Sequence, residues 1–374
     1  MADGAAPRDR PGDAGGGSSG GAPRGAPTVR PMSPAPTASL GALRLAVDDP
    51  ALEARVTDGL EAVETALRRS VASDYPFVTE TSRHLVDAGG KRFRPLLVLL
   101  AAELGDPAAA GVVPAAVAIE LTHLSTLYHD DVMDEAVLRR GADSANARWG
   151  NTVAILTGDF LFARASEITA DLGTESTRIL ARTIAVLCEG QIRETVGPQE
   201  GDDPVAHYLR VVAEKTGSLL ATSGHLGALL AGADPDAVEV MRRYGEVIGV
   251  AFQLSDDVID LVGQPDESGK LPGTDLREGV LTLPVLLALQ QAEQGEPTAA
   301  RVAELVRAGF AGPDGEARVA EVLALLADAP ALARAREVLG GYTAQARAVL
   351  AALPPSPART ALEALASYVE ARTG

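Results

Sequence analysis

Apolar residues recur at helical spacing along most of the chain beyond residue 46. Long runs of Ala, Leu and Val are interrupted mainly by Gly and Pro, and strand-like alternation is scarce. The spacing is clearest in residues 244–261, where steps of three and four predict a helix with a wide buried stripe. Its apolar positions are Tyr244, Val247, Ile248, Ala251, Leu254, Val258 and Leu261. The pattern predicts an all-α fold, a single large helical bundle domain over residues 46–374.

Residues 1–45 have a different composition. They are rich in Gly, Pro, Ala and Ser and hold hardly any large apolar side chain. Such a segment buries too little apolar surface to offset the entropy of ordering it, so we expect a disordered tail. Met32 lies near its end, and a start at Met32 rather than Met1 is an alternative hypothesis.

Composition and charge narrow the class of protein. The chain has 374 residues, a formal net charge of −18 and 46% hydrophobic residues, which favours a globular fold and argues against non-specific nucleic-acid binding. Cys188 is the single cysteine, which favours a reducing compartment. The longest apolar stretches are too short to span a bilayer, and no secretory signal is recognisable. We therefore expect a cytoplasmic protein with no transmembrane segment.

An acidic trio lies in residues 121–141, LTHLSTLYHDDVMDEAVLRRG. On a helix, Asp130 and Asp134 stack one turn apart and Asp131 flanks them. Like charges at this spacing destabilise a helix, so some other interaction has to offset the repulsion. Taken alone, the trio is equally compatible with an exposed acidic helix end.

A second trio weakens that alternative. Asp256, Asp257 and Asp260 repeat the spacing near the end of the largely apolar 244–261 helix. Two such helices are expected to form opposing walls of one cavity. One carboxylate pair at ~4 Å repels by about 4 kcal/mol at an effective dielectric of 20, so the site needs cations. Ligands that are all oxygen favour Mg²⁺, which shares its coordination shell with substrate phosphates.

Cationic residues complement the two trios. Residues 89–95, GGKRFRP, place Lys91, Arg92 and Arg94 beside a predicted helix start, an arrangement that suits a phosphate ester. An ordinary basic turn is the alternative. His123 lies about two turns before Asp130, although a lone helical histidine is more often a packing residue. Lys270 falls in a Gly/Pro-rich stretch, 262–280, that is predicted to be a mobile loop able to close over an anion.

Five ordered segments resemble those of the trans-isoprenyl diphosphate synthases, the polyprenyl synthetase family, from about residue 50 to the end. The segments are GGKRFRP at 89–95, HDDVMDEAVLRRG at 129–141, GDFLFARA at 158–165, KTGSLL at 215–220, and FQLSDDVID with GK and DLREG between 252 and 279. The resemblance implies an all-α fold with a central cavity between the two aspartate helices, and a homodimer.

The resemblance also implies roles for individual residues. Asp130, Asp134 and Asp256 match positions that hold an allylic diphosphate through Mg²⁺, and we assign all six aspartates to metal binding. Residues that match contacts to the same substrate are Arg139, Lys215, Thr216, Gln253 and Lys270, of which we assign Lys215, Lys270 and Gln253 as catalytic. Those that match the isopentenyl diphosphate pocket are Lys91, Arg94, His123 and Arg140. Val280 departs from the pattern, since many members carry Lys there.

The implied reaction is ionisation of the allylic diphosphate, attack by the double bond of isopentenyl diphosphate, and proton loss to the released diphosphate. No nucleophilic side chain is needed. Ser125 and Thr126 lie about one turn deeper than Asp130, at positions where bulky aromatic residues stop chain growth early in the family. Because both are small, we expect a long-chain product of the kind used as a quinone side chain. Replacing Ser125 with Phe is expected to shorten it.

Three alternatives remain open at this point. The nearest is a short-chain synthase that makes a geranylgeranyl or farnesyl product. A terpene cyclase also carries one DDxxD motif, but its second metal motif has a different pattern from DDVID. The cations of 89–95, which suit a second diphosphate substrate, also argue against a cyclase. A non-catalytic subunit would normally lack part of the aspartate motifs, and here both are complete.

A peripheral membrane contact for product release is a further expectation.

Overall fold

The computed structural model describes residues 49–263 and 272–373, and all of them belong to one compact unit. The predicted tail, 1–45, and Lys270 lie outside the described residues. The first part of the described chain supplies the helices α1 (Pro50–Ser70), α2 (Pro76–Asp87), α3 (Phe93–Ala102), α4 (Val112–Met133), α5 (Ala145–Trp149), α6 (Asn151–Asp171) and α7 (Thr174–Val196). The next supplies α8 (Pro204–Val212), the π-helix η1 (Ala213–Gly217), α9 (Ser218–Leu230) and α10 (Pro235–Val262). The last supplies α12 (Thr274–Arg277), α13 (Leu283–Glu293), α14 (Pro297–Ala308), α15 (Gly315–Ala327), α16 (Pro330–Leu350) and α17 (Pro357–Ala371).

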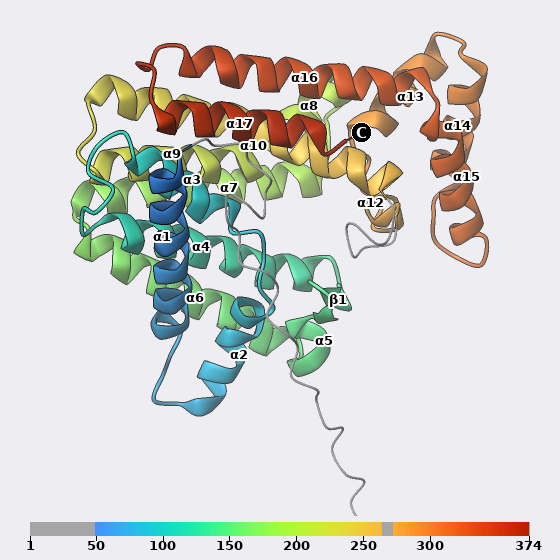
Figure 1. Cartoon of the computed structure of the whole chain (residues 1–374). Coiled ribbons are helices and arrows are strands. Elements are labelled where there is room, and N and C mark those ends of the chain that lie inside the picture. Colours follow the sequence, from blue (N-terminus) through green and yellow to red (C-terminus); the bar gives the residue numbers. More distant parts are fainter. Residues whose placement is uncertain (1–48, 264–271, 374) are drawn as a thin grey trace, which may run out of the picture. The chain divides into compact units, whose positions relative to one another are not determined.

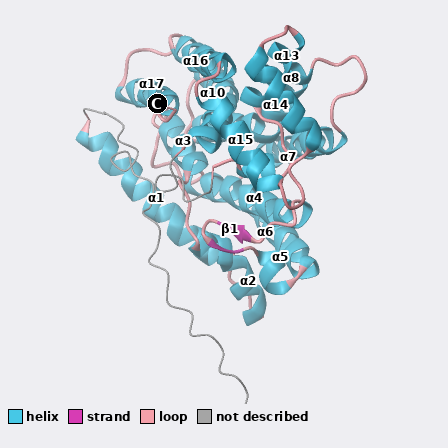
Figure 2. Ribbon diagram, turned by 90° about the vertical axis from the view of Figure 1, so that its right-hand side faces the viewer, coloured by secondary structure: helices cyan, strands magenta, loops and turns pink. Residues whose placement is uncertain are grey.

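Helices make up nearly all of the regular structure, as Figures 1 and 2 show, which confirms the all-α prediction. The strands of the described part are β1 (Leu138–Arg139) and β2 (Ala142–Asp143), which pair antiparallel just after the first acidic trio. No helix within residues 49–263 or 272–373 combines the length and the apolar character that crossing a membrane requires.

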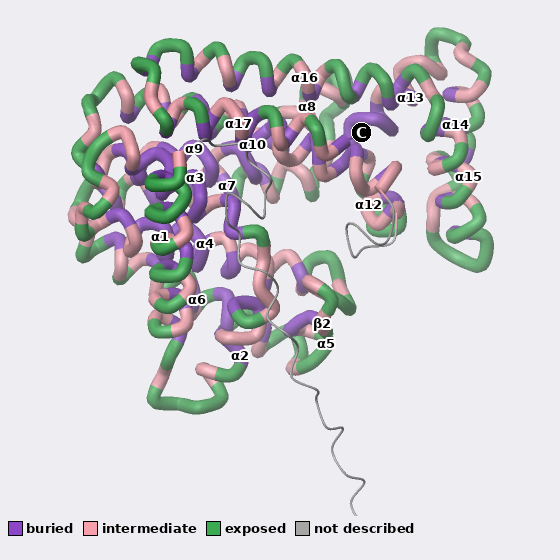
Figure 3. Tube along the Cα trace, in the orientation of Figure 1, coloured by how far each residue is buried: buried purple, intermediate pink, exposed green. Residues whose placement is uncertain are grey.

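A central layer of helices is buried on all sides. In α3 and α9 most side chains are buried, whereas α1 and α16 keep one exposed face (Figure 3). α10 packs against α9 on one side and against α16 on another, and α4 packs against α6 and α9. A separate apolar cluster joins α13, α14 and α15. The core therefore holds α4 and α10, the two aspartate-bearing helices, in fixed places.

Glycine allows α9 and α10 to approach closely. A Cβ atom at Gly245 would lie 2.2 Å from the carbonyl oxygen of Leu220, and one at Gly224 would lie 2.3 Å from that of Met241. Real Cβ contacts are never so short, so only glycine permits this spacing. The close packing brings η1, which directly precedes α9, against α10.

Candidate active site

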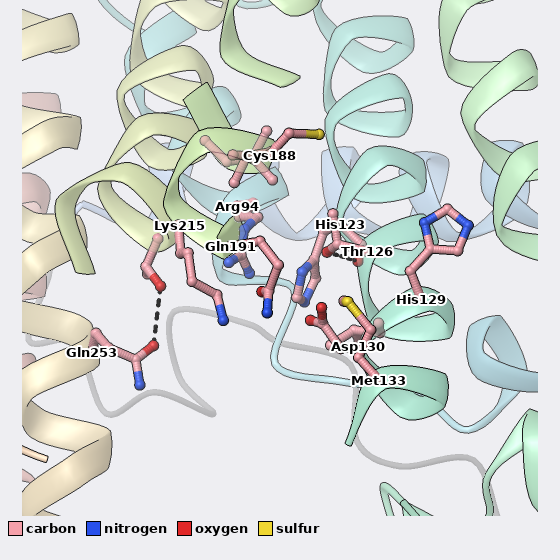
Figure 4. Close-up of a pocket in the computed structure, with 14 residues that line it drawn as sticks. Arg94, His123, Thr126, His129, Asp130, Met133, Cys188, Gln191, Lys215 and Gln253 are labelled. Carbon is pink, nitrogen blue, oxygen red and sulfur yellow. Dashed lines mark hydrogen bonds between the residues drawn. The ribbon is translucent and has the colours of Figure 1, made fainter. Parts of the chain in front are cut away.

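A cavity of about 300 Å³ lies between α3, α4, α7, η1, α9 and α10. Several of its polar side chains point into the same space in Figure 4, among them His123, Asp130, Gln191 and Lys215. The full lining is Arg94, His123, Thr126, Leu127, His129, Asp130, Met133, Leu187, Cys188, Gln191, Lys215, Thr216, Leu219 and Gln253. The cavity is thus polar around Asp130 and Lys215, with apolar wall residues from α4, α7 and α9.

The first trio is divided by the helix geometry. Asp130 lines the cavity, and Asp134 is exposed at the C-terminal end of α4. Asp131 points the other way and is fully buried, and its Oδ1 accepts a hydrogen bond of 2.6 Å from Nε of Arg139 on β1. Positions i and i+4 share one face of a helix and i+1 turns about 100° away, which explains the division.

Burial shapes the titration of this trio. It raises the pKa of Asp130 to about 6, and the neighbouring carboxylates Asp134 and Glu194 add to the rise while Lys215 opposes it. The pKa of Asp131 is also raised by burial, against the nearby Arg139. The ionised form of Asp130 is therefore incompletely compensated by the protein itself.

The second trio lies on α10, where other parts of the chain engage it. Asp256 pairs with Arg372 at the end of α17. Asp257 is buried and accepts hydrogen bonds from the Tyr208 hydroxyl and, at 2.9 Å, from Nε2 of Gln253. The Asp260 carboxylate accepts from the backbone N–H groups of residues 274 and 275, each at 3.2 Å. Of the six trio aspartates, all described, only Asp130 lines the cavity.

Gln253 connects this helix to the cavity. Its Oε1 accepts a hydrogen bond of 3.1 Å from the hydroxyl of Thr216, and the dashed line in Figure 4 marks this contact. Both residues line the cavity together with Asp130 of α4. The two aspartate-bearing helices therefore contribute to the walls of one cavity, as the sequence predicted.

Lys215 lies in the π-helix η1. Its ammonium group pairs with Glu194 of α7, whose carboxylate also accepts a hydrogen bond of 3.2 Å from Nε2 of Gln191. A single π-turn inside a longer helical run is frequent at functional sites, because it redirects side chains. The sequence singled out Lys215 and gave no signal for the π-turn or for Glu194 as its partner.

Arg94 and Arg140 form a cationic cluster around His123. The family resemblance matches these residues to the pocket for isopentenyl diphosphate. Arg94 lines the cavity, and its buried Nε has no hydrogen-bond partner among the described residues. Burial lowers the pKa of Arg94, while Glu120 and Asp256 oppose this. Burial and the nearby Arg94 and Arg140 hold the pKa of His123 well below its usual range, so its ring is neutral. Burial also lowers the pKa of Arg140 to about 10. An anion bound beside Arg94 and Arg140 would stabilise their charged forms, which burial disfavours.

Three further predicted residues have clear places. Lys91 is exposed, Thr126 lines the cavity, and Ser125 is 3% exposed and packed within the bundle. Val280, where the sequence departs from the family pattern, is 37% exposed. The roles assigned to all of these residues stay predictions.

Comparison with known proteins finds a matching family model, similar sequences and similar solved structures. The family model described as polyprenyl synthetase matches residues 75–323. The nonaprenyl diphosphate synthase of Mycobacterium tuberculosis is 51% identical over 87% of this chain and 96% of its own length. A dimethylallyltranstransferase of the same organism is 42% identical over 89% of this chain and 98% of its own. A geranylgeranyl pyrophosphate synthase of Corynebacterium glutamicum, solved with calcium and isoprenyl diphosphate, superposes with a TM-score of 0.77, at 44% identity, covering 88% of this chain and 99% of that one.

Proposed function

Because the chain belongs to the polyprenyl synthetase family, we propose that it condenses isopentenyl diphosphate units onto an allylic prenyl diphosphate to give a long-chain all-trans-polyprenyl diphosphate, a precursor of quinone side chains. One observation carries the proposal. A single cavity gathers Asp130 and Lys215, predicted for the allylic substrate, with Arg94 and His123, predicted for isopentenyl diphosphate. A prenyl transfer between two diphosphates needs both sets within reach of one reaction space.

Mg²⁺ is the proposed metal, held by the aspartates of the two trios, with Asp130, Asp134 and Asp256 toward the allylic diphosphate. Within residues 49–263 and 272–373, no group of three His, Cys, Asp or Glu side chains is placed to hold an ion by itself. The donor set nevertheless fits, because Asp130 in the cavity wall is an ionisable oxygen ligand with a raised pKa, and Asp134, at i+4, lies on the same face of α4. Mg²⁺ commonly binds through one or two carboxylates and takes substrate phosphates as further ligands. When bound, it neutralises the charge of the leaving diphosphate.

The chain's own residues act around that charge. Lys215 and Gln253, with Thr216, Arg139 and Lys270, are proposed to bind the allylic diphosphate and to stabilise it as it leaves, which is the main contribution to rate. Lys215 exchanges Glu194 for the diphosphate. Lys91, Arg94, Arg140 and the neutral His123 are proposed to orient isopentenyl diphosphate. Apolar wall residues exclude water from the allylic cation: Leu127, Leu187 and Leu219. The proton leaves with the released diphosphate.

The test is a product assay with purified protein, a labelled allylic starter, isopentenyl diphosphate and Mg²⁺. A ladder of elongated prenyl diphosphates that disappears when a chelator removes the metal supports the proposal. A cyclic hydrocarbon would instead identify a terpene cyclase, and no turnover under any metal condition would identify a non-catalytic subunit.

The long-chain product is supported by the nonaprenyl diphosphate synthase relative and by the small side chain of Thr126 in the cavity wall. The geranylgeranyl pyrophosphate synthase neighbour keeps a short-chain product as the second candidate. The product lengths in the assay above decide between them.

Replacing Thr126 with Phe is expected to shorten the main product by several isoprene units. An aromatic ring at this lining position fills part of the space that the growing chain enters. Ser125→Phe, the substitution suggested by the sequence, is expected to act less directly because Ser125 is packed inside the bundle. Chromatography of the dephosphorylated products measures both effects. An unchanged product length in Thr126→Phe, with normal turnover, would contradict the proposal that the growing prenyl chain passes Thr126.

A homodimer is proposed from an exposed apolar surface on α6 and α7, which pack against each other. Its residues, with their exposed fractions, are Ile155 42%, Leu156 61%, Phe162 36%, Ile192 63% and Val196 63%. Large apolar side chains exposed on two packed helices favour an interaction site there. We expect sedimentation equilibrium to give twice the chain mass, and Leu156→Glu to shift the protein toward the monomer. A wild-type protein that is monomeric at high concentration would contradict the proposal.

We also propose that the protein is cytoplasmic and makes a peripheral membrane contact when it releases its product.

A further inference from the structure

The middle cation of the 89–95 segment points away from the cavity. Arg92 precedes α3, and its side chain is 1% exposed, whereas Arg94 lines the cavity and Lys91 is exposed at the surface. A charged side chain is almost never fully buried unless it is paired. The burial of Arg92 therefore calls for partners, and the structure provides them.

Three elements bind the Arg92 guanidinium. Nη1 donates to Oε1 of Glu120 on α4 at 2.8 Å, and Nη2 donates to the carbonyl oxygen of Val86 on α2 at 3.0 Å. Glu64 on α1 completes the ion triad through a hydrogen bond from Nε. One side chain thus connects α1, α2 and α4 at the start of α3. The connection fixes the segment that carries Lys91 and Arg94.

The backbone at this place needs such support. Arg92 has φ 46° and ψ 36°, the left-handed region that non-glycine residues seldom adopt because their Cβ crowds the following carbonyl oxygen. Gly89 and Gly90 before it also have positive φ. The carbonyl of Gly89 accepts from Arg140, so the turn is held from both sides. A strained turn of this kind persists when the surrounding structure over-determines it.

Glu120 pairs with Arg92, and its charge also acts on the rest of the cationic cluster. It is 2% exposed, and it opposes the lowering by burial of the pKa values of Arg94 and Arg140. Without Arg92, Glu64 would still have Arg68, at 3.5 Å. Glu120 would be left buried with its charge, and the cations that it acts on next are Arg94 and Arg140. Pairing with either one would withdraw a cation from the second diphosphate.

We propose that Arg92 is a positioning residue for the isopentenyl diphosphate pocket: by binding Glu120 it leaves Arg94 and Arg140 available to the substrate, and it fixes the turn between Lys91 and Arg94. This inference rests on the proposed function. It assigns to Arg92 a role different from that of Arg94, because the Arg92 side chain is buried and does not line the cavity.

The test compares four variants by KM for each substrate and by binding of inorganic pyrophosphate without metal. Arg92→Met is expected to raise KM for isopentenyl diphosphate, and to weaken pyrophosphate binding, by about tenfold or more, since hydrogen bonds to charged groups are worth about that factor. KM for the allylic substrate is expected to stay within about twofold, because its contacts are elsewhere. The double variant Arg92→Met/Glu120→Gln is expected to recover most of the loss, because the freed carboxylate is gone. Arg92→Lys keeps the positive charge but lacks the planar guanidinium group. Its KM for isopentenyl diphosphate is expected to lie between those of Arg92→Met and the wild type.

Arg55→Met is the matched control. Arg55 pairs at 2.6 Å with Glu103, so it joins α1 to the far end of α3, away from the cavity. No change in either KM is expected. Failure of the double variant to improve on Arg92→Met would reduce Arg92 to a merely structural role and overturn the inference, as would an unchanged KM for isopentenyl diphosphate in folded Arg92→Lys. If Arg92→Met does not fold, folded Arg92→Lys still decides through its KM for isopentenyl diphosphate. A wild-type protein without turnover would overturn the proposed function instead, and the pyrophosphate measurement would still report on Arg92.

Discussion

Replacing Asp130 with Asn is expected to lower kcat/KM about a thousandfold and, in the same protein, to stabilise the metal-free fold at neutral pH. The activity falls because a carboxylate proposed to hold the metal is lost, and removing one preorganised electrostatic contact costs about 10²–10³ in rate. The stability rises because the wild-type carboxylate is half-buried in the cavity wall, where its ionised form is disfavoured.

The sign of the pH dependence follows from the raised pKa of Asp130, about 6 against an ordinary value of 3.8. Protonation of this group stabilises the folded state. That stability is fully present below the ordinary pKa and is lost as the pH rises through the folded pKa. Asn cannot ionise, so near pH 7.5 the variant is expected to exceed the wild type by on the order of 2 kcal/mol in unfolding free energy.

Urea unfolding in the presence of a chelator, at about pH 5 and about pH 7.5, measures the stability effect. Asp58→Asn, at an exposed position on α1, is the matched control and is expected to change neither stability nor activity. A wild-type protein that loses no more stability than Asp130→Asn between the two pH values would contradict burial of the Asp130 carboxylate as the cause. Retention of normal turnover by Asp130→Asn would contradict the metal role.

Local periodicity predicted the elements that carry the site. The stripe from Tyr244 to Leu261 is buried in α10, with Val247 half-buried. The trio helix predicted from the sequence does bring Asp130 to a cavity wall, whereas Asp131, which the sequence assigned to the same metal site, is buried away from the cavity. These features depend on helix geometry alone, which sequence spacing encodes.

The same geometry explains a feature common to both trios. Asp131 and Asp257 are the buried members, and each has partners within the protein: Arg139 for the first, Tyr208 and Gln253 for the second. The i+1 position turns away from the face that i and i+4 share. The middle aspartate therefore differs physically from its two neighbours, which the sequence motif, with three identical letters, does not express.

Contacts between distant segments escaped sequence reasoning. Arg372 reaches Asp256 from the end of α17 and stacks over the Phe252 ring at 5.0 Å, although no local pattern marks it. The partners of Arg92 and Lys215 likewise come from other helices. Spacing alone did not distinguish Arg92 from Lys91 and Arg94, which only the family resemblance singled out, because spacing does not encode which side chain turns inward. That choice depends on where Glu64 and Glu120 lie after the helices have packed.

Replacing Arg94 with Gln is expected to raise KM for isopentenyl diphosphate about a hundredfold, while KM for the allylic substrate changes little. Truncating one partner of a buried charge pair costs about 2–5 kcal/mol, which corresponds to a factor of this size. Arg94 is the strongest candidate for such a pair because it lines the cavity with a buried Nε that has no hydrogen-bond partner among the described residues. Burial lowers its pKa, so a bound diphosphate would supply the compensation that the protein leaves incomplete.

Arg94→Lys separates charge from geometry. A lysine keeps the positive charge but lacks the planar fork that binds a phosphate through two parallel hydrogen bonds, so an intermediate KM is expected. Arg301→Gln, at an exposed position on α14 outside the cavity, serves as the control and is expected to leave both KM values unchanged. Steady-state kinetics with each substrate varied in turn provides the measurement. A residue that binds only one diphosphate is expected to affect the other substrate only through shared packing. Equal increases in both KM values for Arg94→Gln would therefore contradict separate cationic subsites for the two diphosphates.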